Sequence, residues 1–178
     1  MIKSMGALSL GIALPAVSKA DVIIQPYQTK KKKITTDVLV IGGGTAGTVA
    51  AIQAGRAGFR TVLVEFGSQL GGTTTTGGVS FPGIFHAWGK QVISGIGWEL
   101  VHDCVEMNGD SLPDFSIPHG RHHPKHQVYI NGPLYTLLAE DKCLDAGVDI
   151  RFYETPLRMK FRKDRWIVET VGKGNHTE

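Results

Sequence analysis

The sequence predicts an α/β fold in which helices flank a parallel β-sheet and a small antiparallel β layer lies beside it. Two short apolar runs rich in β-branched residues, Val38–Ile41 and Thr61–Val64, are typical of buried strands, and Val148–Phe152 forms a third strand candidate. Segments with helical periodicity separate these runs along the chain. Because parallel strands need a crossover connection, strands that alternate with helices favour a parallel sheet.

The first strand leads into a glycine-rich turn with the spacing Gly42-x-Gly44-x-x-Gly47. Gly42 allows a sharp turn into the following helix, and Gly44 lacks a Cβ, so the backbone can approach a pyrophosphate closely. Free amides at the start of the helix, where Thr45 and Ala46 lie, would face the negative charge of that group. Gly47 keeps the helix surface small where it lies against the strand. The pattern predicts a dinucleotide-binding turn.

An acid ends the second strand, as this interpretation requires. Glu65 can accept hydrogen bonds from the two ribose hydroxyls of an adenosine, whereas its charge would repel a ribose 2′-phosphate. No arginine follows Glu65, so NADP is disfavoured. Strand, glycine turn, helix, second strand and acid together are far more specific than glycines alone. The region from Asp37 to Glu65 therefore predicts a Rossmann-type unit.

The segment after Glu65 indicates which dinucleotide is bound. Phe66 follows the acid, and two glycine pairs then enclose four threonines: Gly71, Gly72, Thr73, Thr74, Thr75, Thr76, Gly77 and Gly78. A glycine pair at this distance resembles the second glycine motif of glutathione-reductase-like flavoproteins. The region from Asp37 to Val171 is similar to the FAD-dependent oxidoreductase family related to fumarate reductase flavoproteins. Three further segments support this resemblance: Lys90–Val101, Tyr129–Leu138 and Ala146–Ile150.

The resemblance implies FAD as the cofactor. In that family the segment after the glycine pair lies beside the isoalloxazine ring, so Thr73–Thr76, Gly77 and Gly78 would be flavin neighbours, with Glu65 and Phe66 on the adenosine side. Threonine hydroxyls and unhindered glycine amides are donors that can tune a flavin. The alternative is that the threonine stretch is only a polar loop.

Two amphipathic helices are expected in the second half of the chain, over 95–107 and 131–147. Apolar residues at helical spacing predict the buried face of the first helix: Ile96, Leu100, Val101 and Val105. The same criterion selects four leucines on the second helix: Leu134, Leu137, Leu138 and Leu144. Asn131 can cap the second helix and Gly147 can end it, as Gly58 can end the helix after the glycine turn.

The C-terminal part of the chain predicts a β-hairpin. Leu157–Phe161 and Trp166–Val171 alternate apolar and polar residues around a turn at Lys163–Asp164. In the family that the chain resembles, such a hairpin belongs to the antiparallel layer over the FAD-binding sheet, and Val148–Phe152 lies beside the second strand of that sheet. The last residues, 172–178, are not expected to form a further strand.

His86 is the candidate catalytic residue. It follows the expected flavin segment closely, and a histidine titrates near neutrality, which suits proton transfer. It could instead carry a covalent flavin link or have a packing role only. Three nearby aromatic residues are expected to pack rather than to bind a substrate: Phe81, Phe85 and Trp88.

Four histidines within eight residues suggest a metal site: His119, His122, His123 and His126. Neutral imidazoles bind zinc or copper well, but a metal site needs fixed geometry and usually a fourth ligand. The proline-rich loop offers neither a strand nor a helical i, i+4 frame. We therefore expect no metal.

The chain divides into an expected signal peptide at residues 1–20, a linker at 21–34 and an FAD-binding domain at 35–178. Lys3, an apolar stretch and small residues near Ala20 are typical of a signal peptide, and cleavage would leave Asp21 first. We expect export to the periplasm or the medium. The short start resembles a twin-arginine signal whose arginines would lie upstream. The apolar stretch is too short for an integral membrane segment.

Composition limits the other partners. The net charge of +3 is small and is expected to be spread over the chain. Lys30–Lys33 is expected to be a solvated segment before the first strand, so no nucleic-acid partner is expected. Cys104 and Cys143 lie in segments expected to be helical and are expected to be buried thiols, although in an oxidising compartment they could pair. No Cys-x-x-x-x-Cys redox pair is present, so dithiol chemistry is not expected.

The expected function is the FAD-binding portion of a flavin-dependent oxidoreductase that transfers a hydride between a small-molecule substrate and FAD. The 178 residues are too few for the substrate domain and late flavin-contacting segment of full-length family members, so the portion alone is expected to be inactive. An NAD-dependent dehydrogenase and a non-catalytic nucleotide-binding fragment stay open as alternatives. The substrate and the electron acceptor are not readable from the sequence.

Overall fold

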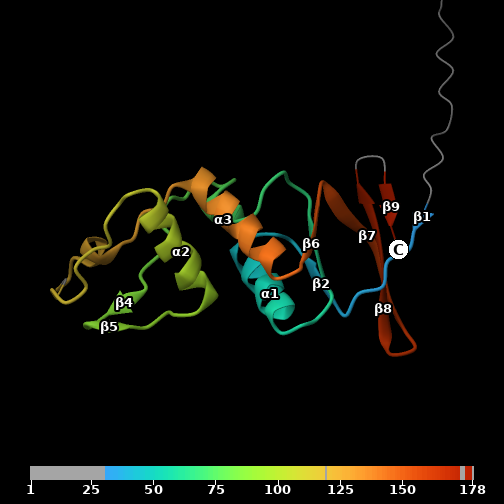
Figure 1. Cartoon of the computed structure of the whole chain (residues 1–178), viewed down its shortest axis with the longest axis horizontal. Coiled ribbons are helices and arrows are strands. Elements are labelled where there is room, and N and C mark those ends of the chain that lie inside the picture. The colour runs from blue at the N-terminus through green and yellow to red at the C-terminus, as the bar shows by residue number, and fades with distance from the viewer. Residues whose placement is uncertain (1–30, 119, 173–174, 178) are drawn as a thin grey trace, which may run out of the picture.

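The structure of the chain, a computed structural model, describes residues 31–118, 120–172 and 175–177. Figure 1 shows three layers side by side, which are a group of helices, a parallel sheet and an antiparallel sheet. The expected signal peptide and most of the expected linker lie outside the described residues. The α/β class predicted from the sequence is confirmed, with the helices on one face of the parallel sheet and the antiparallel layer on the other.

The parallel sheet has the strand order β2-β3-β6. It consists of β2 at Val38–Ile41, β3 at Thr61–Glu65 and β6 at Asp149–Phe152. Both β2 and β6 pair with β3 in parallel, and every residue of β3 is buried. The predicted place of the third strand beside the second is therefore confirmed.

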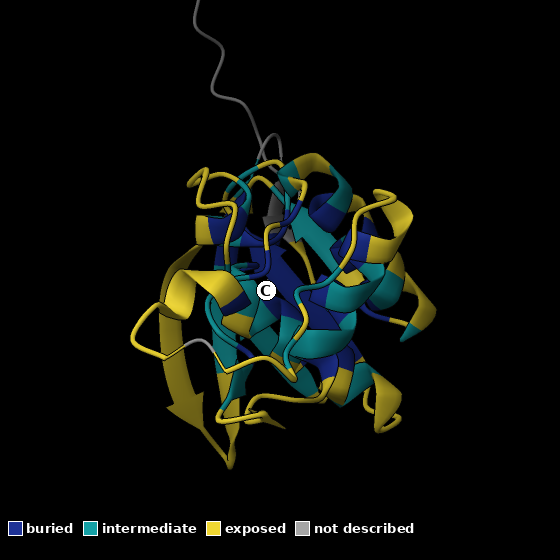
Figure 2. Cartoon of the chain, turned by 90° about the vertical axis from the view of Figure 1, so that its left-hand side faces the viewer, coloured by how far each residue is buried: buried dark blue, intermediate teal, exposed yellow. Residues whose placement is uncertain are grey.

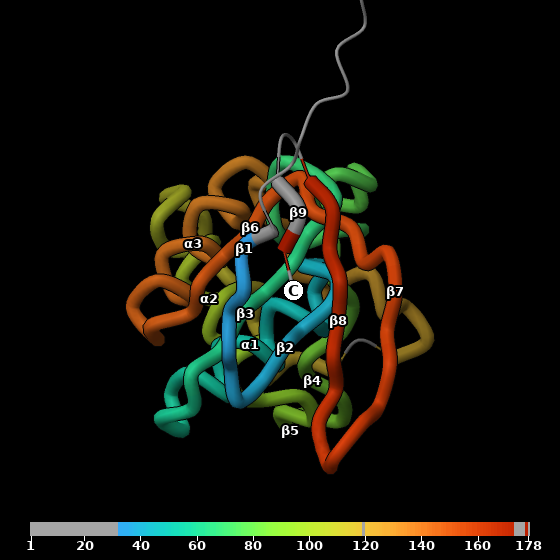
Figure 3. Tube along the Cα trace, turned by 90° about the vertical axis from the view of Figure 1, so that its right-hand side faces the viewer, coloured from blue at the N-terminus to red at the C-terminus, as the bar shows by residue number. Residues whose placement is uncertain are grey.

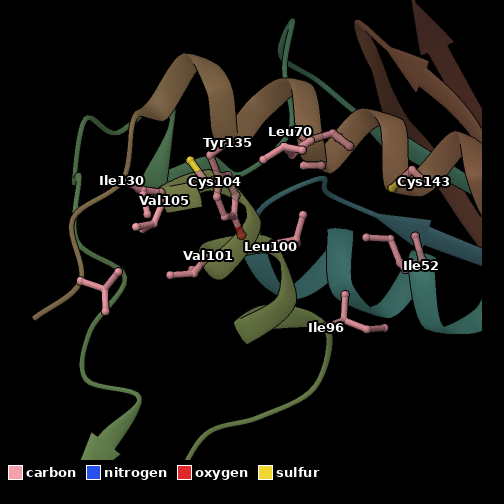
Figure 4. Close-up of a cluster of buried hydrophobic side chains, with 14 of the residues drawn as sticks. Ile52, Leu70, Ile96, Leu100, Val101, Cys104, Val105, Ile130, Tyr135 and Cys143 are labelled. Atoms are coloured by element: carbon pink, nitrogen blue, oxygen red, sulfur yellow. The ribbon is translucent and has the colours of Figure 1, made fainter. Parts of the chain in front are cut away.

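Three helices pack together beside this sheet: α1 at Thr45–Arg56, α2 at Ile96–Met107 and α3 at Gly132–Asp145. All four residues of the predicted buried face of α2 are buried, and Cys104 joins them. Figure 4 shows how side chains from the three helices meet around Leu70 and Tyr135. Figure 2 shows these buried residues gathered at the centre of the molecule.

The predicted buried face of α3 is wrong in part. Leu138 is buried and Leu134 is half-buried, but Leu137 and Leu144 are exposed. The residues that α3 buries lie one step away around the helix: Tyr135, Thr136, Leu138, Ala139 and Cys143. Counting leucines alone misplaces this face because α3 buries an aromatic, a hydroxyl, a small residue and a thiol beside Leu138.

The predicted helix ends are confirmed. The Asn131 side chain accepts a hydrogen bond from the Leu134 amide at 3.2 Å and caps α3. Gly58 and Gly147 adopt positive φ directly after the C-caps of α1 and α3. A left-handed residue at that position lets a helix end sharply, and glycine adopts it at little cost.

Both cysteines lie in helices and are buried, as expected. Cys104 in α2 and Cys143 in α3 are free thiols. Burial raises the pKa of the Cys104 thiol, and it raises that of Cys143 to about 11. Thiols with raised pKa are poor nucleophiles, so both residues act as small apolar groups in the core.

An ion-pair network joins the three helices. The Glu99 carboxylate of α2 accepts two hydrogen bonds from Arg56 of α1, at 2.7 and 2.8 Å, and one from Lys142 of α3, at 2.7 Å. Hydrogen bonds from Arg56 and then Lys142 lower the pKa of Glu99 to about 2. Glu99 therefore stays charged at any pH at which the protein would be used.

The antiparallel sheet has the strand order β1-β9-β8-β7, as Figure 3 shows from the side. Its main part is the hairpin of β7 (Glu154–Arg162) and β8 (Arg165–Gly172). The connecting residues Lys163 and Asp164 both adopt positive φ, of 48° and 60°. Two successive left-handed residues are typical of a two-residue hairpin turn. The predicted hairpin is confirmed and is longer at both ends.

Two short strands of this sheet were not expected. Lys31–Lys32 forms β1, and Asn175–Thr177 forms β9, which pairs with both β8 and β1. The lysine run is therefore part of a sheet and not only a solvated lead-in. Neither strand has the apolar alternation that identifies a strand in a sequence, since β1 is two lysines and β9 is three polar residues.

The other elements are short: β4 at His86–Ala87, β5 at Lys90–Gln91, and 3-10 turns at Gly72–Thr74 and His123–His126. β4 and β5 lie at the opposite end of the molecule from the antiparallel layer (Figure 1). In the part of the chain that the structure describes, no helix combines the length and apolar character needed to cross a bilayer.

Candidate functional site

The first glycine segment lies at the carboxyl end of β2, where the strand meets α1. Gly42 donates its amide to the Val64 carbonyl of β3 at 2.7 Å and adopts a φ of 96°. Only glycine adopts this conformation without strain, so the predicted role of Gly42 in the turn is confirmed. Ligands of open parallel sheets bind at this edge, outside the carboxyl ends of the strands.

The start of α1 is open. Gly44 is the N-cap of the helix and provides no side-chain hydrogen bond, and the first turn contains no acidic residue. A Cβ built on Gly44 would meet no atom within 4 Å. Thr45 and Ala46 line the end of an open groove of about 650 Å³ along α1. Space is therefore free beside the first turn of the helix, whose N-terminus favours an anion.

Gly47 has a different function. A Cβ on this residue would lie 1.8 Å from the Gly42 carbonyl oxygen and 3.4 Å from a Val40 methyl. The helix can therefore approach the turn only with glycine at this position. This is the packing role that the sequence predicts for the third glycine of the motif.

The second glycine segment lies directly against the first. The Gly71 amide donates to the Gly43 carbonyl at 2.8 Å, and Gly44 and Gly71 form an isolated parallel bridge. A Cβ on Gly72 would lie 2.9 Å from the Gly44 Cα. The Thr45 hydroxyl also donates to the Gly71 carbonyl at 3.0 Å. Two segments that are far apart in sequence thus form one backbone surface at the carboxyl edge of the sheet.

Glu65 contacts the first glycine segment at the end of β3. Its Oε2 accepts the Gly43 amide and its Oε1 accepts the Gly67 amide, both at 2.6 Å. The residue is only 7% exposed. Each carboxylate oxygen keeps lone pairs beyond the one that an amide uses. The acid is therefore fixed by main-chain donors with acceptor capacity left.

Gly43 was absent from the predicted site residues, although it joins Glu65 and the second glycine segment to the turn. Its amide binds Glu65, its carbonyl accepts from Gly71, and the Thr48 hydroxyl also donates to that carbonyl at 3.0 Å. A Cβ here would lie 2.5 Å from Leu70 Cδ2. The signal was visible in the sequence, since a third consecutive glycine exceeds what the turn motif needs.

Phe66 stands out from the surface beside the site. It follows Glu65 at the end of β3 and is 76% exposed. A large aromatic ring in this position has apolar area free for a flat ligand.

The threonine stretch divides into inward and outward residues. Thr74 is buried, with its hydroxyl 3.3 Å from that of Thr45, and the Thr75 hydroxyl donates to the Leu70 carbonyl at 2.6 Å. Thr76 accepts from the Gln69 side chain at 3.1 Å. The other residues of the segment that are exposed are Thr73, Gly77 and Gly78. The inward hydroxyls hold the loop in place, and the exposed residues are the ones that a ligand can reach.

His86 is held in an aromatic cluster at β4. Its ring stacks on Phe115, with centroids 3.7 Å apart and planes inclined by 8°, and lies edge-on to Trp98 at 5.1 Å. Its Nδ1 is buried and has no hydrogen-bond partner among the described residues. Burial, and then the nearby His126, lower the pKa of His86. None of the contacts described here joins His86 to the glycine segments.

The neighbouring aromatic and histidine residues follow different patterns. Phe85 is buried as expected, whereas Trp88 is 90% exposed and does not pack. His126 is buried, and its Nε2 lies 2.8 Å from the Ile117 carbonyl oxygen. Of the histidine group, His122 and His123 are exposed, and His119 lies outside the described residues. In the described part, one different group has ligand atoms close enough to bind a metal: His102, Asp103 and Glu106.

Comparisons with known proteins agree with this geometry. A family model described as "FAD dependent oxidoreductase" matches residues 37–177. The chain is 32% identical over 107 residues to nicotine dehydrogenase of Pseudomonas putida, covering 54% of this chain and 21% of that protein. It is 39% identical over 95 residues to thioredoxin reductase of Rickettsia felis, covering 48% of this chain and 30% of that protein. The chain thus matches less than a third of these two relatives.

A solved structure shows the same fold. The anhydrotetracycline hydroxylase of Streptomyces rimosus superposes with a TM-score of 0.54 at 17% identity, over 81% of this chain and 30% of that one. The family model covers most of the chain and includes both glycine segments and Glu65. The chain therefore belongs to the FAD-dependent oxidoreductase family.

Proposed function

We propose that this chain is the FAD-binding portion of a flavin-dependent oxidoreductase that transfers a hydride between a small-molecule substrate and FAD. The main support is the backbone contact between Gly43–Gly44 and Gly71–Gly72 at the open start of α1. A simple NAD-binding turn needs only the first segment. The second segment extends the polar backbone surface beyond the pyrophosphate, as a longer cofactor requires.

The residues present fit the adenosine and pyrophosphate half of FAD. Space is free at Gly44, where a pyrophosphate would meet the first amides of α1. Glu65 has acceptor capacity for the ribose hydroxyls, and exposed Phe66 lies next to it for contact with the adenine. The residues proposed for this half are Gly42, Gly44, Thr45, Ala46, Gly47, Glu65, Phe66, Gly71 and Gly72.

The flavin half would meet the loop that follows. We assign flavin contact to the exposed residues Thr73, Gly77 and Gly78, and to Thr76 if it releases Gln69. Contrary to the expectation from the sequence, the amides of Gly77 and Gly78 are not free donors, because they donate to the carbonyls of Gly72 and Thr75 at 2.9 and 3.0 Å. Thr74 and Thr75 support the loop through their internal hydrogen bonds. When bound, the flavin supplies the redox chemistry, and the protein contributes orientation and hydrogen bonds to the ring.

His86 is proposed as a proton-transferring residue only in the neutral form that its environment favours. Its lowered pKa keeps the ring neutral, and its buried Nδ1 has no hydrogen-bond partner among the described residues, so one ring nitrogen is left to exchange a proton. Its stacking on Phe115 equally supports a packing role. The variant His86→Phe distinguishes proton transfer from packing, because phenylalanine can stack but cannot exchange a proton.

The test is the identity of the bound cofactor. The purified chain should be yellow or should take up FAD, and the small molecule released on denaturation should be FAD by mass and by fluorescence. A colourless protein that binds NAD but not FAD would support a dehydrogenase instead. Binding of neither would support a non-catalytic fragment. Adenosine diphosphate is a useful second probe, because it requires only the adenosine and pyrophosphate contacts.

We also propose that the protein is exported through a signal at residues 1–20, followed by a linker at 21–34 and the FAD-binding domain at 35–178. The support is the short apolar stretch before Ala20. Expression in a bacterial host followed by mass measurement of the mature protein tests this. A mature chain that begins at Asp21 in the periplasm or medium is expected, and an uncleaved chain in the cytoplasm would contradict it.

A further inference from the structure

The end of the β7–β8 hairpin is exposed on both faces. All twelve residues from 155 to 166, called the hairpin tip below, are exposed. Figures 1 and 3 both show the turn at the edge of the molecule, away from the helices. In Figure 3 it extends beyond the rest of the chain. The tip can therefore reach a broad surface without obstruction from the described elements.

One face of the tip is apolar. Leu157, Met159, Phe161 and Trp166 are 61%, 52%, 58% and 64% exposed. Phe161 and Trp166 are register partners, and their rings contact each other with centroids 5.3 Å apart. Four large apolar side chains at the end of one hairpin form a contiguous patch, and such patches mark interaction sites.

The other face and the turn are basic. Arg158, Lys160 and Arg162 alternate along β7 and line one shallow depression together with Ile167 and Glu169. Lys163 and Arg165 add two cations at the turn. The tip holds five basic residues and one acid, a formal charge of +4, although the whole chain has only +3. Positive charge is therefore clustered at the tip, as it also is at Lys30–Lys33, and is not spread evenly over the chain.

Two of these cations face each other. Arg162 and Arg165 are register partners across the hairpin. Like charges directly opposite each other destabilise a strand pair. An anion at the tip would relieve this repulsion, so the arrangement is complementary to a negatively charged partner.

We propose that the hairpin tip docks onto an anionic phospholipid surface. The Phe161–Trp166 pair would enter the boundary between headgroups and acyl chains, where aromatic residues are favoured. The long basic side chains would reach the phosphates beside it. Single-stranded nucleic acid fits less well, because base stacking uses aromatic rings and gives no role to the exposed Leu157 and Met159. This inference is independent of the cofactor assignment.

The test is co-sedimentation of the whole chain with vesicles at low salt. Binding is expected to phosphatidylglycerol-containing vesicles and not to pure phosphatidylcholine, and high salt should release the protein. The triple change Arg162→Gln, Lys163→Gln and Arg165→Gln should weaken binding roughly 100-fold. A matched triple change at exposed cations elsewhere, Lys90→Gln, Arg121→Gln and Lys125→Gln, should have a much smaller effect.

Insertion of the hairpin tip into the bilayer can be measured separately from binding. Brominated acyl chains should quench Trp166 fluorescence, so Trp166→Ser should remove the quenched component while Trp88→Ser, at another exposed tryptophan, should not. The quenching and salt titration of the unaltered chain do not depend on any variant folding correctly. The proposal fails if the chain does not bind anionic vesicles, if both triple variants bind equally, or if single-stranded oligonucleotide is bound in place of lipid.

Discussion

Gly44 and Gly47 belong to one motif, but the structure predicts opposite results when each is replaced by alanine. Gly44 has φ −64° and ψ 177°, which any residue adopts, and its new methyl group would meet no protein atom within 4 Å. Gly44→Ala should therefore fold normally, and loss of chain entropy in the unfolded state can raise stability by about 0.4–1 kcal/mol. The methyl group would occupy the space that the pyrophosphate needs.

The cost to binding can be estimated from the contacts that are lost. If the pyrophosphate can no longer reach two of the first amides of α1, two hydrogen bonds to a charged group disappear, each about 1.5–3 kcal/mol. The affinity for adenosine diphosphate or FAD should then fall by about 3–6 kcal/mol, or roughly 10² to 10⁴-fold.

Gly47→Ala should behave in the opposite way. Its methyl group would lie 1.8 Å from the Gly42 carbonyl oxygen, so the helix must move away from the turn. Overpacking of this kind typically costs about 1–3 kcal/mol of stability. Calorimetric titration with adenosine diphosphate and thermal unfolding without ligand measure the two effects separately. The reasoning is refuted if Gly44→Ala binds the nucleotide as tightly as the unaltered chain, or loses as much stability as Gly47→Ala.

Three further predictions concern Glu65, Glu99 and His86. Glu65→Gln replaces one of the two oxygens that accept the Gly43 and Gly67 amides with a donor. Calorimetric titration should show that adenosine diphosphate binds more weakly by about 1–3 kcal/mol. An unchanged affinity would contradict the ribose assignment. Glu99 has its pKa lowered from 4.5 to about 2, so its stabilising effect is complete above pH 4.5 and is lost as the pH falls toward 2. Glu99→Gln should lower the free energy of unfolding at neutral pH by only about 1 kcal/mol, because Glu99 is partly exposed to solvent. The unfolding temperature of the variant should then depend less on pH on the acid side. An unchanged pH dependence would argue against the ion-pair network. The pKa of His86 lies below 6.5 in the folded chain, so the unfolded chain binds a proton first and stability should fall as the pH drops below 6.5. His86→Phe keeps the stacking and should remove that part of the pH dependence; if it also leaves turnover of the complete enzyme intact, proton transfer by His86 is ruled out.

The sequence by itself determined the strands of the parallel sheet, the glycine turn and the acid at Glu65, because each depends on residues close together along the chain. Hydrophobic periodicity predicted what α2 buries, and a sharp strand-to-helix turn such as the one at Gly42, with a φ of 96°, favours glycine. The same local logic predicted the Asn131 cap and the turn at Lys163–Asp164.

Only the tertiary structure decided the features that depend on distant partners. It brought Gly71 against Gly43, fixed both oxygens of Glu65 on main-chain amides, and turned Leu137 and Leu144 outward. It also left the Phe161–Trp166 pair and the rest of the hairpin tip uncovered by the other described elements. Contacts across more than twenty residues depend on how the layers pack, and no periodicity within one segment encodes the shape of its neighbour.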